Sequence, residues 1–184
     1  MKDGDFMDMR EKKIDGDVIY DGKIIKVIKD KVLCPNGKEA YREVVRHNGG
    51  AGILCITKDN KVLLERQFRY PYDEVIYEIP AGKLEAGEEP YSAALREFEE
   101  ETGNKAEYLE HLIDIYPTCG YSSEVIYLYL AKDYVTTKTN LDEDEIIETE
   151  YIPLDLVMKM IGEGKIKDAK TICALTVYNY RYQK

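Results

Sequence analysis

The chain has 184 residues, and 44% of them are hydrophobic, which is enough for one domain with a buried core. A formal net charge of −10 argues against nucleic acid bound through its backbone, but it does not exclude a small phosphorylated substrate. The four cysteines lack C-x-x-C spacing, which is typical of reduced thiols in a cytoplasmic protein. No apolar run is long enough to span a membrane, and the first residues lack the pattern of a signal peptide.

The N-terminal part predicts a small β element that follows a loose, charged tail at residues 1–13. Its β-rich runs, with a Pro-Asn-Gly turn before the last, are residues 18–20, 24–28, 32–34 and 40–46. An Asn-Gly-Gly break at 48–50 ends this element. We therefore expect one division of the chain, between residues 1–47 and residues 48–184.

The rest of the sequence combines strands with helices. Apolar runs bounded by turn residues predict strands at 51–57, 61–68, 75–79, 108–116, 125–131 and 146–152. Helical periodicity begins at Pro90, recurs at 154–161, and returns after Asp168, which is suited to cap a last helix through Tyr182. This pattern favours an α/β (α+β) fold in which helices cover a central sheet.

The glutamate-rich stretch at residues 82–104 predicts a helix with two side-chain stripes. Pro90 is a natural first helical residue, and Gly103 is a natural C-cap. Apolar residues spaced i, i+3, i+4 and i+7 form the first stripe: Tyr91, Ala94, Leu95 and Phe98. Three carboxylates form the second stripe: Glu97, Glu100 and Glu101. Because like charges on one face repel, a bound Mg²⁺ or Mn²⁺, which prefers oxygen ligands, would stabilise this helix.

A solvated acidic face is the alternative interpretation of these carboxylates, and it is the usual meaning of such a run. Two features count against it. Arg96 stands four positions before Glu100, where it can orient a carboxylate. A glycine-rich loop that contains Glu88 also leads into the helix. The residues therefore favour a built site over a simple charged surface.

The full pattern resembles the signature of the Nudix hydrolases, G-x5-E-x7-R-E-U-x-E-E-x-G-U, where U is bulky and apolar. All the fixed identities are matched: Gly82, Glu88, Arg96, Glu97, Glu100, Glu101 and Gly103. The last apolar position departs, because Asn104 stands there; it lies past the carboxylates, so we expect a small packing difference and no loss of activity. The resemblance implies an α/β/α sandwich with a mixed sheet, and metal-dependent attack of water on a diphosphate.

The resemblance also implies roles for individual residues. Glu97 and Glu101 would be metal ligands, together with the backbone carbonyl of Ala81. Glu100 would act at the same site, either directly or through water. The other motif residues would support the geometry of loop and helix: Gly82, Glu88, Arg96 and Gly103.

The general base is implied outside the motif, on a mobile acidic loop. Glu145 matches that position best, and Glu143 is the alternative; without the family, a solvated loop is the favoured interpretation. The same comparison implies substrate contacts from Arg69, Arg46 and Glu124. An arginine suits a diphosphate because its planar fork makes bidentate contacts, although a surface arginine is more often simply solvated.

Three stretches outside the signature look like the ADP-ribose pyrophosphatase branch of the family: REVVRH at 42–47, ERQFR at 65–69 and IPAGKLE at 79–85. This branch implies hydrolysis of ADP-ribose to AMP and ribose 5-phosphate by a catalytic domain at residues 48–184. It also implies a homodimer in which the N-terminal element packs against the second subunit.

One departure from the branch keeps other substrates open. The branch has an S-P-G-x-x-x-E loop, whereas the chain has TCGYSSE at 118–124, with Cys119 in place of the proline. GDP-mannose or another nucleotide sugar is therefore the alternative substrate. A non-catalytic nucleotide-sugar sensor and an acidic protein-interaction module are further alternatives from other functional classes.

Overall fold

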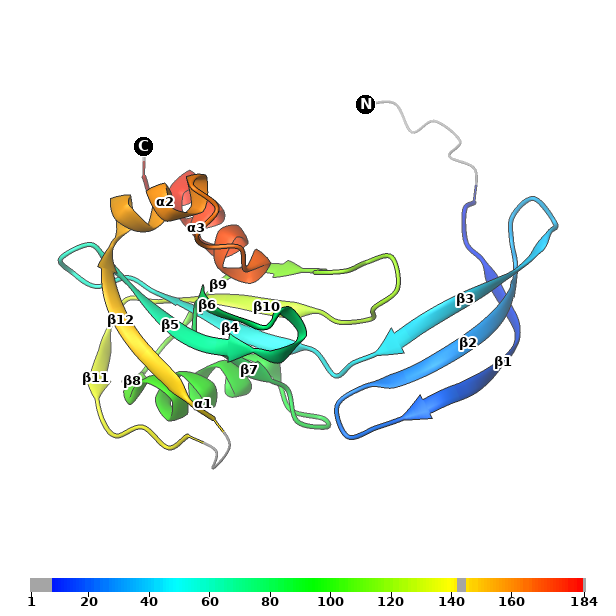
Figure 1. The fold of residues 1–184 in the computed structure, drawn as a ribbon, viewed down its shortest axis with the longest axis horizontal. Helices are drawn as coiled ribbons and strands as arrows, with labels where there is room; N and C mark the ends of the chain where they lie inside the picture. Colours follow the sequence, from blue (N-terminus) through cyan, green and yellow to red (C-terminus); the bar gives the residue numbers. More distant parts are fainter. Residues whose placement is uncertain (1–7, 142–144, 184) are drawn as a thin grey trace. The chain divides into compact units, whose positions relative to one another are not determined.

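The computed structural model describes residues 8–141 and 145–183 of the chain. Contacts between residues divide this part of the chain into two compact units (Figure 1). The smaller unit consists of the described residues up to His47 together with Thr118–Glu124, and the larger consists of Asn48–Pro117 and the residues from Val125 onward. Within the described ranges, no helix is both long and apolar enough to cross a membrane.

The smaller unit is built on a three-stranded antiparallel sheet in the order β1-β2-β3. Its strands are β1 (Lys12–Asp21), β2 (Lys26–Leu33) and β3 (Glu39–Arg46). Gly37 adopts a φ of +78° in the turn between β2 and β3, a conformation that glycine reaches without a steric cost. Every residue of β1 is exposed, so this sheet buries little apolar surface of its own.

Two expectations about this element were wrong in detail. The tail expected at 1–13 ends earlier, because Lys12 already pairs with Leu33. The predicted runs 24–28 and 32–34 belong largely to the single strand β2, since pairing with a strand on each side carries the backbone through the charged residues between them. Tertiary pairing outweighs local β propensity at such positions.

The loop Thr118–Glu124 clusters with β3 rather than with the rest of residues 48–184. The Val45 N–H donates to the Tyr121 carbonyl at 2.8 Å, and the Ser123 N–H donates to the Val45 carbonyl at 2.9 Å. These bonds form a short parallel bridge between the loop and the end of β3. The expected division into 1–47 and 48–184 therefore differs from the compact units in this loop.

The larger unit contains a four-stranded mixed sheet in the order β7-β4-β10-β9, in which β4 and β10 are parallel. A three-stranded sheet, β12-β5-β6, and a short pair, β11-β8, complete it. The strands of the larger unit are β4 (Gly50–Cys55), β5 (Lys61–Arg69), β6 (Glu74–Glu78), β7 (Ala81–Lys83), β8 (Asn104–Ala106), β9 (Glu110–Ile115), β10 (Ile126–Ala131), β11 (Tyr134–Thr136) and β12 (Ile147–Pro153). A 3-10 turn, Tyr70–Tyr72, joins β5 to β6.

The helices of the larger unit lie on both faces of the sheet, with α1 on one face and α2 and α3 on the other (Figure 1). These helices are α1 (Pro90–Thr102), α2 (Leu154–Gly162) and α3 (Ala169–Tyr182). Successive side chains of β4 point to opposite faces of the sheet. Ile53 packs into the core under α1, and Leu54 packs into the core under α2 and α3. The predicted sandwich of helices around a mixed sheet is confirmed.

The main strands and helices expected from periodicity are present within one or two residues of their predicted ends. The last helix begins as predicted, with the Asp168 side chain accepting a hydrogen bond from the Thr171 N–H. Three short strands, β7, β8 and β11, were not predicted, because three residues are too few to show a period.

Candidate active site

The helix α1 holds the carboxylates against the sheet. Pro90 occupies its first turn, and Gly103 ends it in the left-handed conformation, with its N–H bonded to the Glu99 carbonyl at 2.9 Å. Ala94 and Phe98 of the predicted apolar stripe are fully buried. The anchored stripe fixes the rotation of the helix, which directs the neighbouring glutamates toward β7.

Glu97 lies directly against the backbone of Gly82, which is part of β7. A Cβ atom at position 82 would stand 1.9 Å from the Glu97 Cδ and 2.0 Å from its Oε1. Only glycine leaves room for this carboxylate. The first glycine of the motif is therefore required by close approach, with no need for an unusual backbone angle.

Glu101 is 6% exposed, and its Oε2 accepts a hydrogen bond from the Ala81 N–H at 2.9 Å. The sequence comparison implied the carbonyl of Ala81 as a metal ligand beside Glu101. The structure brings the same residue to Glu101 through its amide. Glu97 and Glu101 thus meet two consecutive residues of β7.

Arg96 ties the loop to the helix. Its Nε and Nη2 donate to the two Glu88 oxygens at 3.1 and 3.0 Å. Its Nη1 donates to Glu97 at 2.8 Å and to Glu100 at 3.0 Å. The bonds to Glu88 are the largest of several contacts that raise the pKa of Arg96. These contacts are the kind that a supporting role for Arg96 and Glu88 would need, and that role stays a prediction.

Burial and neighbouring negative charges both disfavour the ionised forms of the Glu97 and Glu101 carboxylates. Burial raises the pKa of Glu97, and proximity to Glu100 and Glu145 adds to that effect against the attraction of Arg96. Burial also raises the pKa of Glu101, and the charges of Glu97 and Glu145 raise it further. Glu145 therefore lies within electrostatic range of both motif carboxylates. Glu143, the alternative general base, lies outside the described residues.

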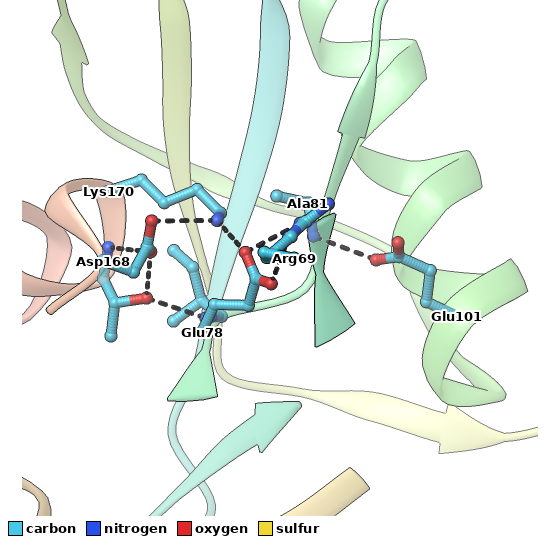
Figure 2. Close-up of polar contacts among 8 residues, drawn as sticks. Arg69, Glu78, Ala81, Glu101, Asp168 and Lys170 are labelled. Carbon is cyan, nitrogen blue, oxygen red and sulfur yellow. Dashed lines mark hydrogen bonds and ion pairs between the residues drawn. The ribbon is translucent and has the colours of Figure 1, made fainter. Parts of the chain in front are cut away.

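A second group of charged residues lies on the side of Ala81 away from Glu101 (Figure 2). Arg69 donates to both oxygens of Glu78, at 2.7 and 2.8 Å, and Lys170 from α3 also donates to Glu78. Burial acts to raise the pKa of Glu78, but the bonds to Arg69 and the nearby Lys170 lower it below the ordinary value. Two cationic side chains, Arg69 and Lys170, therefore hold this carboxylate.

Glu65 of β5 is a further buried acid, 2% exposed. It stands opposite Glu78 of β6 in the antiparallel register of the two strands. Its Oε1 has no hydrogen-bond partner among the described residues. Burial is the main cause that raises its pKa, followed by the charges of Glu101 and Glu78.

Sequence reasoning missed Glu65, Glu78 and Lys170. The available signal was a charged residue directly after the apolar run 62–64, and a second one at the end of the next strand. Lys170 gave no such signal, because a lysine in the first turn of a surface helix is ordinary.

The donor chemistry of the site fits a hard divalent cation. Among the described residues, the His, Cys, Asp and Glu side chains form no ready-made metal cluster of three. Arg96 instead bridges Glu97 and Glu100. Buried Glu101 and partly buried Glu97, both with raised pKa values, nevertheless provide beside β7 the oxygen donors that Mg²⁺ or Mn²⁺ prefers.

The predicted substrate residues fall into both units. Arg69 belongs to the larger unit and is held by Glu78 as described. Arg46 ends β3 and is exposed, and Glu124 lies in the loop that pairs with β3, so both belong to the smaller unit. Glu124 approaches His47, with 3.6 Å between Oε1 and Nδ1.

Asn104, the one departure from the signature, is 3% exposed and begins β8. Its Nδ2 donates to the hydroxyl of Tyr151 at 3.1 Å. The buried amide is thus satisfied by a hydrogen bond where the signature has an apolar contact. The expected small difference in packing is therefore present, and the retention of activity stays a prediction.

Residues 46–175 match the family model of the NUDIX domain. The chain belongs to the Nudix family. Its members generally use divalent metal ions. A solved structure titled "Crystal structure of ADP compounds hydrolase" has the same fold, with a TM-score of 0.81 over 93% of each chain at 20% identity.

Curated relatives cover nearly the whole chain. A methanol dehydrogenase activator of Bacillus methanolicus is 43% identical over 168 residues, which is 90% of each protein. An ADP-ribose pyrophosphatase of Bacillus subtilis is 40% identical over 169 residues, 91% of each. More distant relatives include GDP-mannose pyrophosphatases. The chain is therefore a Nudix hydrolase by family.

Proposed function

We propose that this Nudix hydrolase cleaves ADP-ribose to AMP and ribose 5-phosphate, with Mg²⁺ or Mn²⁺ as cofactor. The observation that carries the proposal is the convergence of Glu97 and Glu101 on Ala81 and Gly82. The similarity to an ADP-ribose pyrophosphatase over nine-tenths of the chain supports the choice of substrate.

Glu97, Glu101 and the carbonyl of Ala81 would hold the cation, with Glu100 binding directly or through water. When bound, a divalent cation neutralises phosphoryl oxygens, orients the diphosphate and lowers the pKa of water. The reaction adds one water across the diphosphate: a P–O bond forms from the water oxygen, and the bridging P–O bond breaks. Positioning and charge stabilisation supply most of the catalysis in such transfers.

Glu145 would accept the proton of the attacking water. Its electrostatic coupling to both Glu97 and Glu101 supports this role, because it puts the carboxylate near the reacting groups. Glu143 is the second candidate on the same loop. Arg69, Arg46 and Glu124 would contact the substrate, with Arg69 directed to the diphosphate.

A panel of ADP-ribose, GDP-mannose and ADP-glucose, with product analysis and EDTA controls, tests the proposal. We expect AMP and ribose 5-phosphate from ADP-ribose, and no turnover in EDTA. Preferential cleavage of GDP-mannose would replace the substrate and keep the reaction. Binding without turnover would favour a sensor, and neither binding nor metal dependence would favour an interaction module.

The name of the Bacillus methanolicus relative describes the activation of another enzyme and states no reaction. The substrate panel tests whether this chain has a reaction of its own. Turnover of ADP-ribose at enzymatic rates would show that it does.

We also propose that residues 1–47 dimerise the chain and that residues 48–184 carry catalysis. The exposure of every residue in β1 supports an additional partner for this sheet, because a small sheet that buries few side chains is marginally stable alone. The cysteines in the described structure are free thiols, which suits a cytoplasmic protein.

A further inference from the structure

Arg69 is the last residue of β5. Its guanidinium bonds a buried carboxylate, and part of the side chain is open to solvent. Nε and Nη2 donate to the two oxygens of Glu78 at 2.7 and 2.8 Å, while 37% of the side chain stays exposed. Nη1 donates no hydrogen bond to the described part of the chain. A guanidinium fixed along one edge in this way presents its other N–H groups to an anion.

Glu78 has a second cationic partner, which comes from a distant part of the sequence. Lys170, near the start of α3, is 8% exposed and donates to Glu78, which is itself 1% exposed (Figure 2). Its Nζ also lies 3.2 Å from the Asp168 Oδ1. Buried charges of this kind persist only when each is paired, so this lysine is not an ordinary solvated residue.

Hydrogen bonds join the start of α3 to the chain at the end of β6, and they fix the position of Lys170. Asp168 accepts from the Thr171 N–H at 2.9 Å and from its hydroxyl at 2.6 Å. The Thr171 hydroxyl oxygen in turn accepts the Ile79 N–H at 2.8 Å. Two residues later, Ala81 donates to Glu101. A continuous set of contacts therefore links α3 to the strand beside the motif carboxylates.

We propose that Lys170 is a positioning residue for substrate recognition. By sharing Glu78 with Arg69, it fixes the guanidinium edge that meets the diphosphate of the nucleotide sugar. Lys170 itself contacts no substrate. The inference rests on the proposed function, which gives Arg69 its contact with the diphosphate.

Charge balance gives the physical reason. In the native cluster, Glu78 and Asp168 are balanced by Arg69 and Lys170. Without the lysine, two carboxylates remain near one cation. Arg69 is then drawn further onto the carboxylates and is less available to the substrate, so the loss falls on binding and not on the chemical step.

A double-mutant cycle tests this inference with the nucleotide sugar that the wild type cleaves best. Lys170→Met removes the ammonium and keeps an apolar stem of similar length, and Arg69→Gln removes the guanidinium. We expect Lys170→Met to raise KM about tenfold with kcat changed less than about threefold, the scale of one charge-assisted contact. In the Arg69→Gln background, the same change should add no further rise, because coupled residues are not additive.

Lys167→Met is the matched control. Its Nζ bonds both oxygens of Glu74 at 2.9 Å, so it also joins β6 to the segment before α3, but at an exposed surface. We expect it to leave KM and kcat unchanged. Thermal unfolding of every variant separates a loss of folded protein from a loss of affinity, since a purely structural role lowers Tm without raising KM.

Equal effects of Lys170→Met in the wild-type and Arg69→Gln backgrounds would overturn the inference, as would an unchanged KM. If Lys170→Met does not fold, Lys170→Gln, which keeps an N–H donor without charge, enters the same cycle. Calorimetry measures the ADP-ribose affinity of the same variants, so the double-mutant cycle can be completed without turnover. A wild type that binds but does not cleave thus refutes the proposed function while the positioning role is still decided.

Discussion

The carboxylate of Glu97 occupies the space that a side chain on Gly82 would fill, with 1.9 Å between the Glu97 Cδ and an ideal Cβ at that position. Gly82→Ala should therefore displace Glu97 from β7, because the end of a glutamate moves more easily than the backbone. We expect kcat to fall at least about a hundredfold while the protein stays folded, as shown by circular dichroism. Gly162→Ala is the control and should retain full activity, because among the described residues an added Cβ there would meet no atom within 4 Å apart from its own helix backbone and chain neighbours.

Glu145→Gln should lower kcat by about a hundredfold or more if this residue is the general base, since that is the scale of such contributions. Single-turnover kinetics with saturating ADP-ribose and Mg²⁺ measure the chemical step. Glu143→Gln serves as the comparison on the same acidic loop. A change of less than about threefold for Glu145→Gln, with a large change for Glu143→Gln, would move the role to Glu143.

Arg96→Gln should lower the free energy of unfolding by about 1–3 kcal/mol, because it breaks charge-assisted bonds to Glu88 and to the α1 carboxylates. Urea unfolding followed by circular dichroism measures it. Arg66→Gln removes a partly exposed guanidinium that pairs with Glu148 and Glu150 at the surface and lies over the Tyr77 ring, and it should cost less than about 1 kcal/mol. Equal losses for both variants would show that the Arg96 bonds contribute no special stability.

The metal-free protein should lose stability as the pH rises from about 4.5 upward. The pKa values of Glu65 and Glu101 are raised in the folded state above their ordinary value of 4.5, mainly by burial. A raised carboxyl pKa means that the folded state binds the proton more tightly, so its stabilising effect is present at low pH and disappears as the pH passes the folded pKa. Urea unfolding in EDTA at a series of pH values measures this slope.

Glu65→Gln should flatten that dependence, because the amide cannot ionise. Glu148→Gln, which changes an exposed carboxylate, should leave the slope as it is. Added Mg²⁺ should stabilise the wild type most at the higher pH values, where the carboxylates would otherwise be charged and uncompensated. A slope that is the same in wild type and Glu65→Gln would contradict the role of buried acids.

Ile19→Asp should shift the chain toward monomer if β1 forms the dimer interface. Ile19 is 61% exposed in a strand whose residues are all exposed, so an aspartate there harms an interface more than the fold. Sedimentation velocity measures the change. Leu156→Asp, at an exposed position of α2, is the control and should not alter the oligomeric state. A monomeric wild type would refute the dimer itself.

The local pattern of the sequence was sufficient for α1 and for the reaction class. Pro90, the apolar spacing and Gly103 define a helix without tertiary information, and that helix fixes which glutamates share a face. The central sheet covered by helices also followed from the pattern, because long apolar strands and amphipathic helices can be buried together in few ways, whereas the mixed strand directions were implied by the family resemblance. The short strands β7, β8 and β11 could not be predicted, since pairing alone makes them strands.

The sequence by itself determined the family, the carboxylate helix and the kind of chemistry they suit, because these depend on residue types at fixed short spacings. Only the tertiary structure decided that Glu97 lies against Gly82 and that Glu101 bonds Ala81. It alone placed Lys170 on Glu78, which is 92 positions away in sequence. Contacts at such separations arise when the sheet brings distant segments together, and no local period encodes them.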